Sequence, residues 1–234
     1  MIVIMWILII IFIAIASAII YSQIRNARIY RELLQSVTSP HRGTKSEHDL
    51  VVALLKSGIL ADDIFHDLYV RKYNGHSQID LVVMTKVGLI VFEVKDYSGW
   101  IFGNGNHTNW TKVLAYGRQK YKFYNPIKQN LGHIAALRKH LSENIPIYSI
   151  ILFAGNCELR DISFVPNGTF IAKPYRILSV MRDIIDNNQP VDFLTENQIR
   201  TILKESVKNG DNIDAESTHI ENVRNMLGHD RIYG

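Results

Sequence analysis

The first twenty residues of the chain contain no charged side chain, and all of them except Ser17 are apolar. In a helix they would span about 30 Å, the thickness of the hydrocarbon core of a bilayer. Arg25, Arg28 and Arg31 follow this run, and no Lys or Arg precedes it. Such basic residues mark the cytoplasmic end of a membrane-spanning helix. We therefore expect a single-pass anchor over residues 1–21 in the cell membrane, with the N-terminus outside and the remaining chain in the cytoplasm.

A cleaved signal peptide is the alternative interpretation of this run, because small residues occur at Ala14, Ala16 and Ala18. Signal peptides begin with a positive charge and have a shorter apolar core, so the sequence favours the anchor. Elsewhere, the single cysteine, Cys157, excludes an internal disulfide and any multi-cysteine metal site.

The pattern of apolar residues after the anchor predicts an α/β sandwich, with strands flanked by helices. Helices are expected near residues 46–57, 126–142 and 174–187, and strands near 64–71, 77–85, 88–95, 147–153 and 169–172. The Gly- and Asn-rich stretch 97–110 is expected to be irregular. We divide the chain into an anchor, a juxtamembrane stalk over 22–45 that is helical over 24–34, a main domain over 46–188, and an acidic C-terminal tail over 189–234 with helices near 195–207 and 216–227.

Basic charge is concentrated in one stretch. From Tyr97 to Ser142 there is no Asp or Glu, but there are seven basic residues: Lys112, Arg118, Lys120, Lys122, Lys128, Arg138 and Lys139. Aromatic residues alternate with several of them: Tyr116, Tyr121, Phe123 and Tyr124. Because a basic, aromatic-rich surface attracts a phosphate backbone, we expect nucleic acid to bind Lys112, Arg118, Lys120, Lys122 and Lys128. A solvated face, or a surface against anionic lipid headgroups, is the alternative.

Two β-rich runs on either side of the dipeptide Lys86-Val87 predict a hairpin. If this dipeptide is the turn, Asp80 lies opposite Glu93, and Lys95 shares a face with Glu93. Two carboxylates that face each other on a buried sheet repel one another. A divalent cation together with the lysine would remove this repulsion, and Mg²⁺ commonly uses one or two carboxylates as ligands.

A third carboxylate, Glu47, lies on the same predicted helical face as the apolar residues Leu50 and Leu54. A structural explanation also exists, because an acid in the first turn favours the helix dipole. In addition, Ser46-x-x-Asp49 resembles a capping box. That motif would explain Asp49 fully and Glu47 only in part.

A following helix is expected to begin at Asn125-Pro126, with Gln129 and His133 one turn apart on it. Taken together, the acids, the lysine and the glutamine are the parts of a metal-dependent phosphodiesterase. A bound cation lowers the pKa of an attacking water. Lys95 would hold that water or stabilise the charge that develops on the phosphate.

One constellation of residues extends across these elements: Glu47, Gln78-Ile79-Asp80, Gly88-x-x-Val91-x-Glu93-Val94-Lys95-x-Tyr97-Ser98-Gly99, Trp110 and Asn125-Pro126-x-x-Gln129. Over roughly residues 40–155 it resembles the nuclease-related domain family, NERD, which is itself similar to the PD-(D/E)XK nucleases. The resemblance implies a restriction-endonuclease-like αβββαβ core with a central mixed sheet, and many members carry one membrane-spanning segment. Ile79 stands where the wider superfamily has Pro.

The resemblance also implies that Glu47, Asp80 and Glu93 hold Mg²⁺ or Mn²⁺, and that Lys95 acts in catalysis with Glu93, Asp80 and Gln129. The expected function is that of a membrane-anchored nuclease that hydrolyses phosphodiester bonds of DNA. Two alternatives stay open. One is a catalytically inactive nucleic-acid-binding or scaffold module that retains the nuclease fold, and the other is an adaptor whose 97–142 face docks on lipid.

Overall fold

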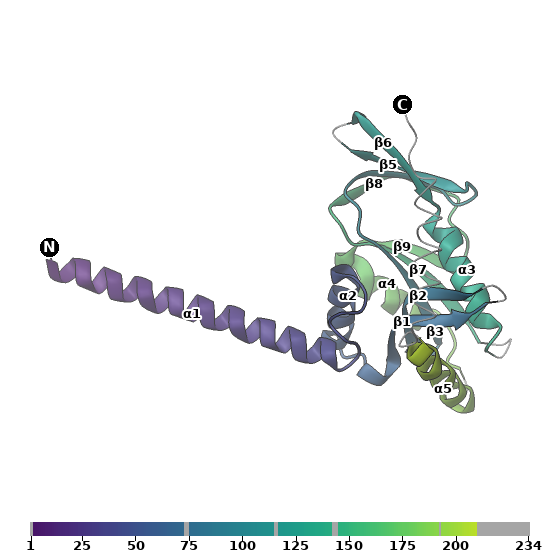
Figure 1. Ribbon diagram of the computed structural model, residues 1–234, viewed down its shortest axis with the longest axis horizontal. Coiled ribbons are helices and arrows are strands. Elements are labelled where there is room, and N and C mark those ends of the chain that lie inside the picture. Colours follow the sequence, from purple (N-terminus) through teal and green to yellow (C-terminus); the bar gives the residue numbers. More distant parts are fainter. Residues whose placement is uncertain (1, 73–74, 115–116, 142–144, 192, 210–234) are drawn as a thin grey trace.

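The computed structural model describes residues 2–72, 75–114, 117–141, 145–191 and 193–209 (Figure 1). Its centre is a five-stranded sheet with the order β1-β2-β3-β7-β9. The strands are β1 (Ile64–Arg71), β2 (His76–Thr85), β3 (Gly88–Lys95), β7 (Ile147–Phe153) and β9 (Thr169–Ala172). The first three pair antiparallel and the last three pair parallel, so the sheet is mixed. The sequence predicts all five strands.

Helices cover both faces of this sheet. On one face lie α2 (Lys45–Lys56) and α4 (Ile177–Asp186), and on the other lie α3 (Pro126–Arg138) and α5 (Phe193–Asn209). Short 3₁₀ turns, η1 (Ala61–Asp63) and η3 (Pro174–Arg176), precede β1 and α4. Strand β3 is apolar on both sides because Phe92 faces α2 and α4 while Val91 faces α3 and α5. The expected α/β fold, a mixed sheet flanked by helices, is confirmed.

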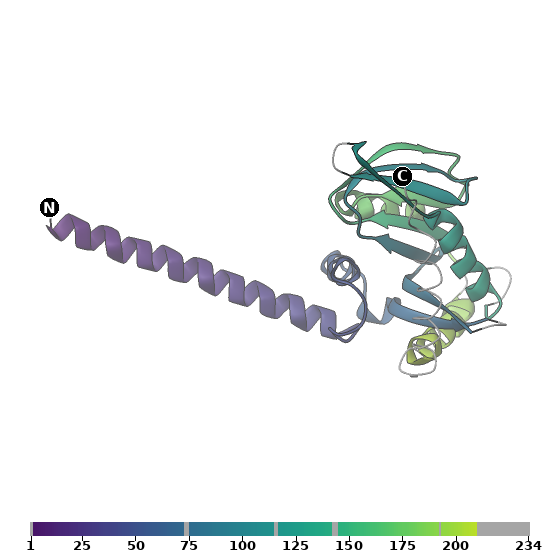
Figure 2. The same cartoon turned by 45° about the horizontal axis from the view of Figure 1, so that its top comes forward.

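A second sheet has four strands in the order β6-β5-β4-β8 and lies over the end of the first sheet (Figures 1 and 2). Its strands are β4 (Gly99–Asn104), β5 (Asn109–Leu114), β6 (Gln119–Tyr124) and β8 (Cys157–Ser163). The prediction of an irregular stretch over 97–110 is therefore wrong, and β6 and β8 were not predicted. Residues 115 and 116, and with them Tyr116, lie outside the described part of the chain.

Gly103 explains why this sheet is difficult to predict from the sequence. A Cβ atom at Gly103 would lie 2.2 Å from Cδ2 of the buried Trp110, so glycine is needed for the close approach of β4 to the indole ring. In a sequence, however, clustered Gly and Asn residues are typical of turns. The Trp110 ring stacks on Phe153 of β7 with 6.1 Å between centroids, which joins the two sheets in one apolar cluster.

The N-terminal helix α1 (Ile2–Gln35) is continuous and extends away from the domain (Figure 1). Among the described residues it is the one helix long and apolar enough to cross a membrane. Residues 24–34, which were expected to form a helix in the stalk, continue the helix of the apolar run. At its C-terminal end, Leu34 is buried in the core beside α2, and the Tyr30 hydroxyl donates a 2.8 Å hydrogen bond to Asp49. The helix is therefore attached firmly to the domain.

The region expected to be a tail also contributes to the core. Ile199 and Leu203 of α5 are fully buried against the sheet, on the same face as α3. This packing makes residues 193–209 part of the folded domain. The helix predicted near 216–227 lies outside the described residues.

Candidate active site

The hairpin of β2 and β3 has the register that the two-residue turn predicts. Thr85 pairs with Gly88 and Leu81 pairs with Phe92, after which the ladder ends. The next residue is Asp80, and its Oδ2 atom accepts a 2.7 Å hydrogen bond from the backbone N–H of Val94. Asp80 therefore lies beside Glu93, as predicted. At this position the backbone N–H of Val94 donates to the Asp80 side chain, and the backbone pairing of the two strands does not continue.

Asp80 also lies at an irregularity shared with β1. His66 pairs with Leu81 and Leu68 pairs with Ile79, but the intervening residues, Asp67 and Asp80, are skipped. On β2, Ile79 and Val82 point to the same side although they are three residues apart, so the alternation of side chains inverts between them. Asp67 has a φ of 55°, a left-handed conformation that Asp tolerates better than most residues.

Asp67 is held in this conformation by three hydrogen bonds. Arg42 donates one to the Asp67 carboxylate and one to its backbone carbonyl, both at 2.8 Å. The Gln78 amide donates the third, at 2.6 Å. The irregularity that places Asp80 is thus fixed by buried charge and not by a glycine.

Glu93 is the centre of the site and is almost completely buried. Its Oε1 atom lies 2.6 Å from Lys95 Nζ, which also donates a 3.1 Å hydrogen bond to Gln129 on α3. Its Oε2 atom lies 3.2 Å from His133 Nε2, and the other ring nitrogen of His133 lies 2.7 Å from the Ser77 hydroxyl. Among the described residues, Glu93 Oε2 accepts no hydrogen bond of good geometry.

The charges in this cluster are strongly coupled. Burial raises the pKa of Asp80 well above its usual value, and the carboxylates of Glu93 and Glu47 raise it further. Burial alone would raise the pKa of Glu93, but the charges of Lys95 and His133 lower it below its ordinary value. Burial would lower the pKa of Lys95, but Glu93 reverses this effect and the pKa is raised. Glu93 and Lys95 are therefore both ionised at neutral pH.

Glu47 has a different environment from the one expected. Thr44, not Ser46, caps α2, and Glu47 forms the capping box with it, which corrects the assignment of that motif to Ser46 and Asp49. The backbone N–H and the hydroxyl of Thr44 both donate to Glu47 Oε1, at 3.3 and 2.7 Å. Glu47 Oε2 lies 3.1 Å from His66 Nε2. Glu47 is close enough to affect the pKa of Asp80, but both of its oxygens already have partners.

The described residues contain no group of three or more His, Cys, Asp or Glu side chains arranged to hold a metal ion. The structure thus brings Asp80 and Glu93 together, whereas Glu47 affects the pKa of Asp80 but is held by the helix cap and by His66. Two observations fit a hard divalent cation at the first two residues. Their carboxylates repel each other, and the buried Glu93 Oε2 atom accepts no hydrogen bond of good geometry, although His133 Nε2 lies 3.2 Å away. Two carboxylates completed by water are a common environment for Mg²⁺.

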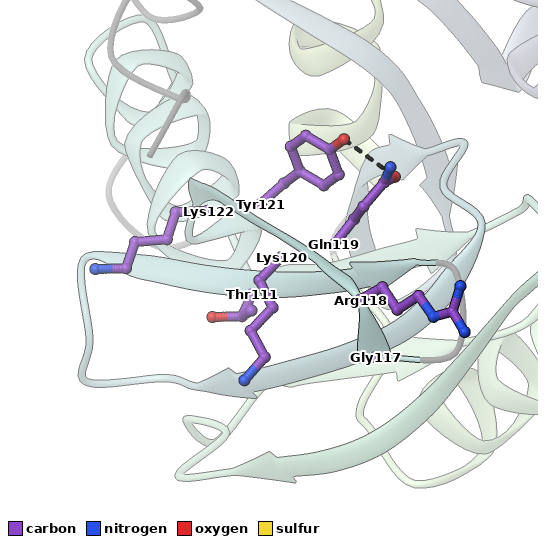
Figure 3. A pocket seen from close by; sticks show the side chains of 7 residues that line it. All are labelled: Thr111, Gly117, Arg118, Gln119, Lys120, Tyr121 and Lys122. Carbon is purple, nitrogen blue, oxygen red and sulfur yellow. Dashed lines mark hydrogen bonds between the residues drawn. The ribbon is translucent and has the colours of Figure 1, made fainter. Parts of the chain in front are cut away.

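The basic residues predicted to bind nucleic acid lie on the second sheet and at the start of α3. Arg118, Lys120 and Lys122 line an open hollow of about 620 Å³ on the β5–β6 hairpin (Figure 3). The ammonium of Lys112 lies over the ring of Tyr97, 4.7 Å from its centroid. Lys128 donates a 2.8 Å hydrogen bond to the carbonyl of Asn106 and is tied to a loop instead of the hollow.

Three residues that were not among the predicted site residues surround the site: His133 contacts Glu93, Ser77 contacts His133, and Asp67 pairs with Arg42 at the irregularity beside Asp80. His133 has a signal in the sequence, because it stands one helical turn after Gln129. Ser77 and Asp67 have none, since each takes its position from the inverted alternation at Asp80.

Comparison with known proteins finds matches over the part of the chain that contains this site. Residues 42–154 match the model of the nuclease-related domain. An uncharacterised protein of Bacillus anthracis is 33% identical over 101 residues, which cover 43% of this chain and 47% of that protein. The match thus spans about half the length of that relative. No solved structure matches the chain significantly. The matched segment contains Asp80, Glu93, Lys95 and Gln129, so the candidate site lies within the part of the chain that is similar to the nuclease-related domain, NERD.

Proposed function

We propose that the chain is a membrane-anchored nuclease that hydrolyses phosphodiester bonds of DNA with Mg²⁺ or Mn²⁺. The observation that carries this proposal is the convergence of Asp80, Glu93, Lys95 and Gln129 at one partly accessible place on the sheet. Buried carboxylates with a paired lysine cost folding free energy, and a fold that needed only stability would be served as well by apolar residues. The family match supports a nuclease-related role in the same residues.

Asp80 and Glu93 are the residues that would hold the cation, and Glu47 would act on it through its charge. When bound, the cation would position the scissile phosphate and lower the pKa of the attacking water. Lys95 is a cation held by Glu93 on one side and by Gln129 on the other. In that position its ammonium would stabilise the negative charge that develops on the phosphate oxygens. Gln129 would orient Lys95, since its amide oxygen accepts a hydrogen bond from the ammonium.

The membrane part of the proposal rests on α1. Residues 1–20 would lie in the bilayer, and Arg25, Arg28 and Arg31 would place the domain on the cytoplasmic side. The remaining part of α1, residues 21–35, would extend about 22 Å from the membrane before it joins the core. A helix without a break would hold the domain at that height above the bilayer.

The test uses the full-length protein in neutral lipid nanodiscs with plasmid DNA and Mg²⁺ or Mn²⁺. We expect cleavage that EDTA abolishes and that Lys95→Ala reduces at least about 100-fold, because a charge-stabilising group is lost. DNA binding by Lys95→Ala should persist. Lys86→Ala is the matched control, since Lys86 is exposed at the opposite end of the same hairpin. Equal cleavage by Lys95→Ala and the wild type, with the circular dichroism spectrum unchanged, would refute the proposal.

A second candidate function is a non-catalytic nucleic-acid-binding module. The environment of Glu47 favours it, because both carboxylate oxygens are used in the helix cap and the His66 contact. This function predicts salt-sensitive DNA binding and no change in melting temperature with Mg²⁺. A nuclease that binds metal must instead melt at a higher temperature in Mg²⁺.

A further inference from the structure

The β5–β6 hairpin combines positive charge with exposed aromatic rings. Three cations, Arg118, Lys120 and Lys122, line its hollow, and no acidic side chain is among the lining residues. Tyr121 lies in the same hollow with 38% of its surface exposed, and Tyr124 follows with 36%. In Figure 3 the lysines and Tyr121 leave the strand in different directions. Because side chains alternate along a strand, Lys120 and Lys122 lie on one face of β6 and Tyr121 on the other, so the cations and the ring flank the same edge strand of the sheet.

The strand register connects this hollow to the candidate active site. Lys112 pairs with Tyr121 across β5 and β6, so the two side chains share a face of the sheet. The Lys112 ammonium lies 5.5 Å from the Tyr121 ring centroid and 4.7 Å from that of Tyr97. Tyr97 in turn follows Lys95 by two residues at the end of β3. Alternating rings and cations therefore form a continuous series from the hollow to Lys95.

This series suits one form of nucleic acid best. In a duplex the faces of the bases are hidden in the stack, so a protein surface meets phosphates and the groove edges. In a single strand the bases can stack on aromatic side chains while the cations contact the backbone. A purely electrostatic site for a duplex would need Lys and Arg but would have no use for exposed tyrosines.

We propose that the β5–β6 hairpin is a binding site for single-stranded nucleic acid, with Tyr121 as a stacking platform and Lys120 and Lys122 as phosphate contacts. The part of this inference in which the hairpin leads a substrate to Lys95 rests on the proposed nuclease function. As a binding site, it does not depend on cleavage. Lipid headgroups are a poorer occupant, because no aliphatic side chain is found among the described residues that line the hollow. Figures 1 and 2 also place the hairpin at the other end of the domain from the junction with α1.

The experiment measures fluorescence anisotropy with the full-length protein in neutral nanodiscs and with EDTA present, so that no cleavage occurs. The probes are an oligodeoxythymidine, a duplex of equal length, and an abasic strand with the same number of phosphates. We expect the oligodeoxythymidine to bind more tightly than the other two. Tyr121→Leu should weaken its binding about fivefold or more, as loss of one stacked base does, and should leave the abasic strand unaffected.

Lys120→Gln should weaken binding of both single strands and lower the slope of log affinity against log salt by about 0.7, the value for one lost phosphate contact. Tyr175→Leu and Lys86→Gln are the controls, since both residues are exposed outside the hairpin. They should bind as the wild type does.

Three outcomes would overturn the inference. The duplex could bind as tightly as the single strand, Tyr121→Leu could have no effect, or vesicles of anionic lipid could bind the hairpin and displace the oligonucleotide. Binding of single strands without any cleavage in Mg²⁺ would refute the nuclease and leave the binding site standing. Cleavage in Mg²⁺ without a binding preference for single strands would refute the binding site and leave the nuclease standing.

Discussion

Asp80 is the residue at which the stability of the fold and the proposed function conflict most directly. Its carboxylate is half-buried, lies beside Glu93, and has a raised pKa because of burial and because of the neighbouring carboxylates. Asp80→Asn removes the charge while an amide oxygen can still accept the hydrogen bond from Val94. We expect this variant to be more stable than the wild type in EDTA at neutral pH.

The size of the effect follows from the geometry. Side chains at cross-strand positions place two carboxylates about 6 Å apart, and at an effective dielectric constant of about 20 they repel by roughly 3 kcal/mol. Lys95 attracts Asp80 and offsets part of this repulsion. A net gain of about 1–2 kcal/mol remains, which for a domain of this size raises the melting temperature by about 2–8 °C.

The pH dependence of stability is a separate test of whether the charge of Asp80 destabilises the fold. Because the pKa of Asp80 is higher in the folded state than in the unfolded state, its charge destabilises the fold only above the unfolded value of about 3.9. The destabilisation grows as the pH rises toward the folded pKa and is constant above it. The difference in melting temperature between Asp80→Asn and the wild type should therefore vanish near pH 4 and increase as the pH rises toward the folded pKa of Asp80.

Differential scanning fluorimetry in EDTA and in Mg²⁺ measures both effects. The wild type should gain stability in Mg²⁺, by about 2.7 kcal/mol when the free metal is one hundred times its dissociation constant, and Asp80→Asn should gain little. Asp183→Asn, an exposed aspartate on α4, is the control and should follow the wild type. A variant that melts at or below the wild-type temperature in EDTA would refute the reasoning on charge. An equal gain in Mg²⁺ for both proteins would refute Asp80 as a ligand.

Two further predictions concern the fold that supports the site. Gly103→Ala should destabilise the domain by about 1–3 kcal/mol, because the new methyl group would overlap the buried Trp110 ring, and urea denaturation followed by tryptophan fluorescence measures this loss. An unchanged urea midpoint for Gly103→Ala would show that the Trp110 ring can move to make room for the methyl group, and would contradict this prediction. Thr44→Ala should cost about 1 kcal/mol through loss of the cap on α2, while Ser46→Ala should leave that cap intact. Calorimetry measures this loss, and an unchanged melting temperature of Thr44→Ala would contradict the assignment of the cap.

The parts of the site that the sequence predicts are those with local signals. A two-residue turn sets the register of β2 and β3, and the spacing of Glu93 and Lys95 places both on one face. The inversion at Asp80 could not be predicted, because it depends on Arg42 reaching across from the segment before α2 to hold Asp67. The second sheet was missed for a related reason, since a glycine required by the contact with Trp110 has the same appearance in a sequence as a glycine in a turn.

The segment between α1 and α2 links the helix proposed as an anchor to the candidate site. Near the end of α1, Leu34 is buried in the core, and the Thr38 hydroxyl lies 2.9 Å from His66 Nδ1. Arg42 holds Asp67 beside Asp80. Gly43 packs so closely on His66 that a Cβ atom there would lie 2.5 Å from the ring. The same short stretch therefore fixes the direction of the long helix and the irregularity that positions Asp80. A fragment that began after Thr38 would lose the contacts of Leu34 and Thr38, so a fragment used to study the site must keep the end of α1.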